Sequence, residues 1–383
     1  MGEWKRVKLG DVADYVTDKS EVMGLALEDY ISTENMLPNK GGISLASSVP
    51  SYGSVTEFCQ GDVLLSNIRP YFKKIWKATR DGFCSNDILA LRVKNCICDS
   101  FLFSALSNDA FFDYVMASAK GTKMPRGDKQ QILEYPILLP PLPTQRKIAA
   151  VLGALDDKIE NNRKICANLE AQAQAIFKSW FVDFEPFGGK MPQGWKISSI
   201  YDFAEIIYGA PFKSNLFNEK SIGRPIIRIR DLKNNETKTF TTEHHDKEYL
   251  VQPGDLVVGM DGEFRPYIWG NYPALLNQRV CVFKPLDNVS TAFLYCTIKP
   301  QLALVEATDV ATTVIHIGKE DFDSFKICLP SEWWLSKFND VAQNAFAAMT
   351  KYRLESRSLA AMRDALLPKL MSGEIDVEKV EVA

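Results

Sequence analysis

The sequence predicts a mixed α+β protein with two similar α/β domains, joined by two long helices that form an antiparallel coiled coil. Three observations support this prediction. The chain resembles itself at a shift of about 190 residues. Short apolar runs bounded by Gly, Asn and Pro recur in both halves, and each half ends in a long helical pattern. The repeat implies an internal pseudo-two-fold relation between the halves.

The internal repeat rests on several matches that keep the same order. Gly61–Leu65 resembles Gly254–Val258, and each stretch leads to an Arg-Pro-Tyr triplet, at Arg69 and at Arg265. The other matches are Trp4 with Trp195, Thr122 with Thr312, and Tyr135–Pro140 with Phe325–Pro330. Each match is weak alone, but their common order and spacing argue against coincidence.

Each half shows the pattern of a small mixed domain. In the first half, Asp62–Ile68, Ile88–Val93 and Tyr135–Leu139 are predicted strands, and Asp99–Ala119 is a predicted helix. In the second half the predicted strands are Pro225–Ile229, Asp255–Met260, Arg279–Phe283 and Ser324–Leu329, and the predicted helix is Val289–Glu306. The chain therefore divides into a first domain (1–143), a first long helix (144–184), a second domain (185–330), a second long helix (331–372) and a tail (373–383).

The two long helices carry a heptad seam, in which apolar positions alternate in steps of four and three. In the first helix the seam is Ile148, Leu152, Leu155, Ile159, Asn162, Cys166, Leu169, Ala173, Ile176 and Trp180. Shifting by the repeat gives Phe338, Ala342, Ala345, Met349, Tyr352, Ser356, Leu359, Arg363, Leu366 and Leu370. Because the seam survives the shift, the repeat includes the helices.

Connectivity predicts how the helices pair. The first helix leads into the second domain and the second helix leaves it, so helices that pair along their length must be antiparallel. Asn162 lies near the middle and matches Tyr352, so these residues should lie close together, with Asn162 as a polar register-setter. The alternative is two surface helices on separate domains, but the strongly polar face of Asp156–Lys164 argues against it.

Composition limits the class of protein. The net charge is −3 and the isoelectric point is about 5.8, which disfavours a general nucleic-acid coat. The eight cysteines are scattered and are expected to be reduced thiols, and a zinc site is not expected. The chain has no apolar run long enough for a membrane span and no signal region at its start, so a cytoplasmic location is expected. Nucleotide-loop, dinucleotide, zinc-protease and serine-hydrolase motifs are not found in the sequence.

Basic stretches with aromatic residues favour DNA binding through local patches. Residues 69–80 combine cations with three aromatic side chains and no acid, and residues 120–129 form a second basic loop. Cations on loops suit phosphate contact, and Arg can also grip a guanine edge. A solvated surface is the alternative for any single patch. The candidate DNA-contacting residues are Arg69, Tyr71, Lys73, Lys74, Lys77, Lys120, Thr122, Lys123, Arg126, Arg228, Arg230, Arg265, Tyr267, Arg279, Thr312 and Lys319.

Several longer motifs resemble a known family. Leu139–Ile148, followed by Leu155–Ile159, is similar to the first central region of the specificity subunits of type I restriction–modification systems. Phe177–Phe184 and Arg363–Ile375 are similar to the helix-end segments of that family. One departure is Ser331–Leu335, which lacks the Pro and Gln of the corresponding first-repeat motif and leaves the start of the second helix open.

The resemblance implies a function in sequence-specific DNA recognition without catalysis. Each target-recognition domain would read one half of a bipartite, asymmetric double-stranded DNA site, and the helices would set the spacer. The helices would also dock two modification (methyltransferase) subunits, with two restriction subunits completing the complex. This chain would bind no cofactor itself, whereas S-adenosylmethionine, ATP and Mg²⁺ would belong to the partners. The rival hypotheses are a stand-alone bivalent DNA-binding regulator, and a nuclease or methyltransferase in its own right, for which no motif speaks.

Overall fold

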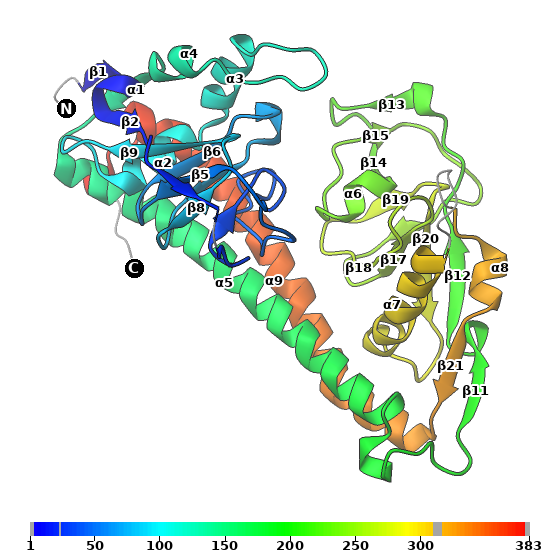
Figure 1. The fold of residues 1–383 in the computed structure, drawn as a ribbon. Coiled ribbons are helices and arrows are strands. Elements are labelled where there is room, and N and C mark those ends of the chain that lie inside the picture. The colour runs from blue at the N-terminus through cyan, green and yellow to red at the C-terminus, as the bar shows by residue number, and fades with distance from the viewer. Residues whose placement is uncertain (1–3, 23, 309–315, 380–383) are drawn as a thin grey trace. The chain divides into compact units, whose positions relative to one another are not determined.

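The computed structural model describes residues 4–22, 24–308 and 316–379, and it contains two compact units (Figure 1). The first unit comprises Met1–Asp157 together with Leu359–Ala383, and the second comprises Lys158–Ser358. Two long helices, α5 (Leu142–Phe181) and α9 (Glu332–Ser372), each contribute residues to both units. None of the helices in the described ranges is both long and apolar enough to cross a membrane.

The first unit contains three small sheets. Strand β1 (Lys5–Lys8) pairs with β10 (Pro136–Leu139). One four-stranded sheet has the order β2 (Ala13–Tyr15), β9 (Ile88–Val93), β6 (Val63–Ser66) and β7 (Ile75–Lys77). The other has the order β3 (Lys19–Glu21), β5 (Ser54–Phe58), β8 (Gly82–Cys84) and β4 (Tyr30–Ile31). The shorter helices are α1 (Leu9–Val12), η1 (Pro70–Phe72), α2 (Asp99–Leu106), α3 (Asp109–Ala117), α4 (Lys129–Leu133) and η5 (Val377–Lys379).

The second unit repeats this plan. Strand β11 (Lys196–Ser199) pairs with β21 (Lys326–Leu329), and a four-stranded sheet has the order β12 (Ala204–Tyr208), β20 (Val280–Pro285), β17 (Leu256–Gly259) and β18 (Pro266–Ile268). A third sheet has the order β13 (Phe217–Asn218), β15 (Phe240–Thr241), β14 (Arg224–Ile227), β19 (Ala274–Leu276) and β16 (Leu250–Val251). The shorter helices are η2 (Glu185–Phe187), η3 (Ile200–Asp202), η4 (Ser214–Leu216), α6 (Ile229–Leu232), α7 (Thr291–Thr308) and α8 (Lys319–Asp323).

The sheet topology confirms the internal repeat but corrects one of its matches. Leu64 lies opposite Trp76 across β6 and β7, and Val257 lies opposite Tyr267 across β17 and β18. Tyr267 therefore corresponds to Trp76, which makes Arg265 the counterpart of Lys74. The two Arg-Pro-Tyr triplets are wrongly equated in the sequence comparison, because residues 69–74 form an extra turn before the strand in the first unit only.

One predicted helix proves to be two. The span Asp99–Ala119 is broken between α2 and α3, where the Asn108 side chain accepts a hydrogen bond from the backbone N–H of Ala110 at 3.1 Å. Asn is favoured at such a helix start because its short side chain satisfies a backbone donor that has no helical partner. The apolar periodicity continues across the break because both helices bury Phe side chains in the same core, including Phe101 and Phe111.

Segments of both long helices pack into the core of each unit and run antiparallel there. In the first unit, Ile148 and Leu152 of α5 share an apolar cluster with Leu367 and Leu370 of α9. In the second unit, Cys166 Sγ approaches the carbonyl of Met349 at 3.6 Å, and Phe177 packs on Phe338. Residue numbers rise along α5 as they fall along α9, so the antiparallel pairing predicted from connectivity is confirmed in both units.

The buried stripe of the long helices departs from the predicted seam at several positions. The Phe177 and Phe181 side chains are buried where Ile176 and Trp180 were expected, and Phe346 is buried in place of Ala345. A straight α-helix has 3.6 residues per turn, so a strict heptad seam rotates by roughly 20° per heptad around the helix. This rotation accounts for the one-residue advance to Phe177 and Phe181 toward the end of α5, whereas Phe346 lies between Ala342 and Met349, which are buried as predicted.

Asn162 occupies the middle of the seam, as predicted. Its side chain is only 1% exposed, and its amide donates to the Tyr352 carbonyl at 3.5 Å, Glu355 Oε2 at 2.8 Å and Ser356 Oγ at 3.3 Å. The closeness of Asn162 and Tyr352 is confirmed. The register-setting role of Asn162 stays a prediction.

The start of α9 has a buried apolar residue at the position where the start of α5 has a buried polar one. In the first unit the buried Gln145 accepts from the Cys98 N–H and donates to the carbonyls of Cys96 and Pro140. The corresponding Leu335 is buried in the apolar cluster of the second unit. One turn later, Asn339 donates to the carbonyl of Asn288 at 2.8 Å, which restores a polar link to the loop before α7. The unusual Ser331–Leu335 motif therefore still starts a helix.

Candidate nucleic-acid interface

The two basic stretches of the first unit meet in space. Ile68 and Arg126 form an antiparallel bridge, and the backbone N–H of Arg69 donates to the Pro125 carbonyl at 2.8 Å. The Gly127 N–H donates to the carbonyl of Asn67 at 3.3 Å. Segments that are distant in the sequence thus form one surface, which we call the first basic surface. It carries Arg69, Tyr71, Lys73, Lys120, Thr122, Lys123 and Arg126.

The backbone of this surface adopts conformations that side chains other than Gly rarely accept. Arg69 and Lys73 both have left-handed backbone angles, with φ of 51° and 52°, and they flank η1. Such conformations are uncommon for residues other than Gly and cost energy. The turn exposes Tyr71, which is 47% accessible, beside Phe72. Gly127 is required for the close packing, because a Cβ there would lie 2.7 Å from Val115 Cγ1.

Acidic side chains hold the cations of the first basic surface in place. Lys73 pairs with Asp109 at 2.8 Å, Lys120 with Asp128 at 2.7 Å, and Arg126 with Asp87 at 3.1 Å. Burial raises the pKa of Asp109, but hydrogen bonding and charge from Lys73 and Lys40 outweigh it and hold this pKa below its usual value. The hydrogen bond from Lys120 likewise lowers the pKa of Asp128. Asp109 and Asp128 therefore stay ionised near neutral pH, so any phosphate must compete with them for Lys73 and Lys120.

Two predicted residues lie outside this surface. The Lys74 ammonium donates to the carbonyl of Thr33 at 2.5 Å and lies near the Phe72 ring. The Lys77 ammonium, at the far end of β7, donates to Ser100 Oγ at 2.6 Å and pairs with Asp99 at 3.7 Å. The strand direction separates Lys77 from Lys73, which the run of cations in the sequence does not reveal.

The second unit places a charged cluster at the position corresponding to Arg126. Asp261 and His316 form an antiparallel bridge, and their side chains approach at 2.7 Å. Arg279 lies 3.5 Å from Asp261 and 3.3 Å from the His316 ring nitrogen. Lys319 follows at the start of α8 and pairs with Asp323 at 2.9 Å. Thr312 lies outside the described residues.

Arg228 and Arg230 lie on and beside the short helix α6. The Arg228 guanidinium donates to Thr239 and stacks over the Phe217 ring at 5.8 Å, and its backbone N–H donates to Asp231 at 2.9 Å. Arg230 is exposed. Arg228 is therefore largely used in holding α6 against its neighbours, whereas Arg230 is available on the surface.

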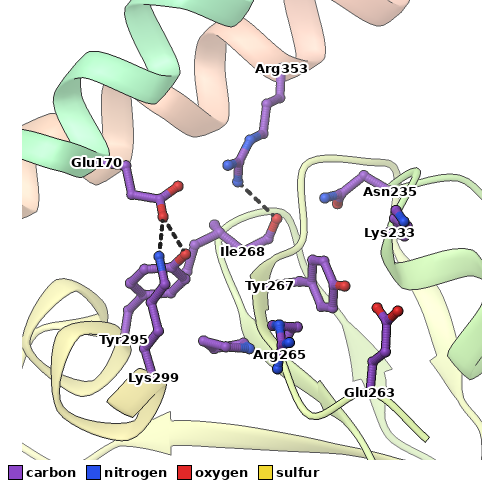
Figure 2. Close-up of a pocket in the computed structure, with 11 residues that line it drawn as sticks. Glu170, Lys233, Asn235, Glu263, Arg265, Tyr267, Ile268, Tyr295, Lys299 and Arg353 are labelled. Carbon is purple, nitrogen blue, oxygen red and sulfur yellow. Dashed lines mark hydrogen bonds and ion pairs between the residues drawn. The ribbon is translucent and has the colours of Figure 1, made fainter. Parts of the chain in front are cut away.

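Arg265 and Tyr267 line a cavity of about 550 Å³ together with residues of both long helices (Figure 2). Arg265 pairs with Glu306 of α7. Across the cavity, Glu170 of α5 accepts from Tyr295 Oη at 2.6 Å and Lys299 Nζ at 2.9 Å.

The contacts in this cavity tie the second domain to the long helices. Burial raises the pKa of Glu170, but the hydrogen bonds from Tyr295 and Lys299 and the Lys299 charge outweigh burial and lower this pKa below its usual value. Arg353 of α9 donates to the Ile268 carbonyl at 3.0 Å. Arg265 and Tyr267 therefore line the cavity together with residues of the long helices, whereas Arg279 does not line it.

Sequence reasoning missed Asp87, Asp261 and His316. The signal was present, because Arg126 and His316 occupy matching positions of the repeat and both precede a short helix, α4 and α8. Among the described residues, no three His, Cys, Asp or Glu side chains gather closely enough to hold a metal ion.

Known proteins resemble this chain along nearly all its length. A family model described as the type I restriction modification DNA specificity domain matches residues 1–171 and 192–332. The chain is 25% identical to the HindI specificity subunit of a type I restriction enzyme from Haemophilus influenzae, over 98% of this chain and 100% of that protein. It is also 25% identical to the MjaIX specificity subunit from Methanocaldococcus jannaschii, over 98% of this chain and 94% of that protein.

A solved structure shares the fold. The S subunit of a type I restriction-modification system from M. genitalium aligns over 96% of both chains with a TM-score of 0.52 and 16% identity. The two family-model matches fall on the two halves of the repeat and together cover most of the sequence. The chain therefore belongs to the family defined by the type I restriction modification DNA specificity domain, and it contains two copies of this domain.

Proposed function

We propose that this chain is the DNA-recognition subunit of a type I restriction–modification complex, and that each unit reads one half of a bipartite, asymmetric site. The observation that carries the proposal is the duplication: both units present charged loops at corresponding places on corresponding sheets. Two recognition units with different side chains in one chain suit a DNA site with two different halves. The relatives named as specificity subunits support the same role.

The chemistry of modification and cleavage belongs, in this proposal, to partner subunits. Two modification subunits would bring S-adenosylmethionine, and two restriction subunits would bring ATP and Mg²⁺, all in the cytoplasm. The long helices are suited to docking, because their seams are buried in the units while Val341, Met362 and Trp333 remain exposed on α9. Apolar side chains exposed on a helix favour contact with another protein.

The direct test is to map methylated adenines in DNA exposed to this chain assembled with its modification subunit. One bipartite asymmetric motif with a fixed spacer is the expected result. Methylation without sequence preference would refute the proposal. Tight, sequence-specific binding by this chain alone, unchanged by the modification subunit, would favour the stand-alone regulator instead.

Salt dependence tests whether the first basic surface contacts phosphates. Each lost phosphate contact lowers the slope of log affinity against log salt by about one. We expect Lys73→Gln and Lys123→Gln each to lower the slope of the assembled methyltransferase in this way, at every sequence tested. Lys94→Gln, just after β9, which removes the Lys94–Asp14 pair and the hydrogen bond to the Gly10 carbonyl, serves as the matched control. An unchanged slope in both test variants would remove this surface from the interface.

A further inference from the structure

The same backbone position in both units carries a cluster of mixed charge, which we call the strand-end cluster. In the first unit it consists of Asp87 and Arg126, and in the second of Asp261, Arg279 and His316. Asp87 and Arg279 each directly precede the central strand of their sheet, β9 and β20. Arg126 and His316 each lie on the segment before a short helix, α4 and α8.

Hydrogen bonds show that the two positions are equivalent. The Asn67 N–H donates to the carbonyl of Asp87 at 2.9 Å, and the Met260 N–H donates to the carbonyl of Arg279 at 2.9 Å. The bridge between Ile68 and Arg126 corresponds to the bridge between Asp261 and His316. The backbone beneath both clusters is therefore fixed by the same bonds, and only the side chains differ.

The backbone of each strand-end cluster is held by hydrogen bonds, whereas the charged ends of the arginine side chains are accessible. The Arg126 and Arg279 side chains are 56% and 53% exposed, although each is paired with a carboxylate. A rigid backbone with accessible charged tips suits recognition, because little order has to be gained on binding. In the first unit the cluster also adjoins the first basic surface through Arg126.

The chemistry of the two clusters is different at matching places. The residue before the central strand is an acid in the first unit and an arginine in the second, and the segment before the short helix carries an arginine in the first and a histidine in the second. A bond that only stabilised the fold could use the same pair in both units. Readers of two different DNA half-sites need different donors and acceptors.

We infer that the strand-end clusters are base-reading elements, one for each half-site. This inference rests on the proposed function and deepens it by naming specificity-determining residues. An arginine fork matches the O6 and N7 acceptors of guanine, and a carboxylate accepts from the N4 amino group of cytosine. In the free protein the acid orients the arginine, and on DNA each can face its own base edge.

The test uses the assembled methyltransferase and a DNA library randomised across both half-sites. Asp87→Asn and Arg126→Gln should alter base preference at one or two positions of one half-site, while Asp261→Asn and Arg279→Gln should alter only the other. A good bidentate contact discriminates by at least about fivefold, so a loss of at least that size is expected. Arg279→Lys keeps the charge without the fork, and it should lose the base preference while keeping the salt slope.

Matched controls and contrary outcomes separate the alternatives. Lys94→Gln in the first unit and Lys238→Gln in the second break exposed pairs elsewhere and should leave base preference unchanged. Each variant must still assemble with the modification subunit, which excludes unfolding. Weaker binding to every sequence alike would make the clusters phosphate contacts, and unchanged binding would place them outside the interface; either result overturns the inference. A wild-type complex with no bipartite preference would instead overturn the proposed function.

Discussion

Asn162 is a polar residue in an otherwise apolar seam, and it binds three groups of α9. Polar residues at such positions usually specify one register at a cost in stability. Here the three acceptors lie within one turn of α9, at Tyr352, Glu355 and Ser356. Sliding α9 by one turn would leave the buried amide without these partners.

The register-setting role predicts a separation between stability and uniqueness. Asn162→Leu should keep or raise the melting temperature of the second unit but should allow other registers. Met349→Cys, placed beside the native Cys166, allows the register to be measured by thiol crosslinking, because the Cys166 sulfur lies 3.6 Å from the Met349 carbonyl. We expect a short thiol crosslinker to join these cysteines in high yield with Asn162 present and in lower yield with leucine. Equal yields would show that the register is set elsewhere.

Asp231 gives the second unit a pH dependence. Burial in the first turn of α6 raises the pKa of Asp231 to about 6, above its usual value, although the Arg230 charge opposes the shift. Between about pH 4 and pH 6 the native state therefore keeps a proton that the unfolded state has released. Since stability falls with pH wherever the native state binds more protons, this group lowers stability as the pH rises through that window.

Removing the titrating group should remove this slope. Asp231→Asn keeps an acceptor for the Arg228 N–H, so we expect its stability relative to wild type to grow as the pH rises from about 4 to 7. A shift of about two pKa units sets an upper limit near 3 kcal/mol for this growth. Thermal unfolding of both proteins across this range is the measurement. A constant difference between them at all pH values would contradict the prediction.

Residue types in the sequence identified two basic stretches but not the partners of their cations. The cations of the two basic stretches were found, whereas their convergence through Ile68 and Arg126 depends on sheet pairing that no local pattern encodes. The Arg-Pro-Tyr match was wrong for a related reason. A short motif can recur by chance near a true repeat, and only the strand register separates Arg69 from Arg265.

At the scale of elements, the long helices were predicted most accurately. Their bounds, Leu142–Phe181 and Glu332–Ser372, lie within a few residues of the predicted ones, because a pattern of this length is hard to mistake. The faces of these helices were less predictable, since the rotation that brings Phe177 and Phe181 inward depends on the true helical period. The break between α2 and α3 was missed because apolar spacing alone does not report a cap.

The starts of the two helices should respond differently to one exchange. Gln145→Leu would leave the Cys98 N–H and the carbonyls of Cys96 and Pro140 without this partner, the Pro140 carbonyl at a buried site and the other two groups at partly buried ones. A buried unsatisfied group costs about 1–3 kcal/mol, so we expect a loss of at least that size. Thermal unfolding measures the loss, and amide exchange should show faster opening of the 96–98 loop. Gln172→Leu, at an exposed position on the same helix, should change stability by less than about 0.5 kcal/mol.

At the scale of the whole molecule, the proposed function makes helix length the determinant of the DNA spacer. Four residues added to α5 after Asn162, matched by four in α9 beside Tyr352, lengthen each helix by about 6 Å and add a rotation of about 40°. That length corresponds to roughly two base pairs at 3.4 Å each. We expect the methylated motif to gain one or two spacer positions while both half-sites stay unchanged.

The same mapping experiment separates the outcomes of the insertion. Changed half-sites would show that the helices affect base reading directly. An unchanged spacer at full activity would show that the length of the helices does not determine the spacer. Insertion into α5 alone is the control, because it breaks the match between the helices and should abolish assembly.

The division of the first unit between both ends of the sequence has a consequence for biosynthesis. Its core buries Leu367, Leu370 and Val377 beside Ile148 and Leu152. On the ribosome residues 4–157 are made first, yet their apolar surface is covered only after residues 359–377 have been added. The second unit, continuous from Lys158 to Ser358, can close earlier. Of the two units, the one whose synthesis begins first is thus completed last, and a frameshift within α9 would damage the first unit as well as the second.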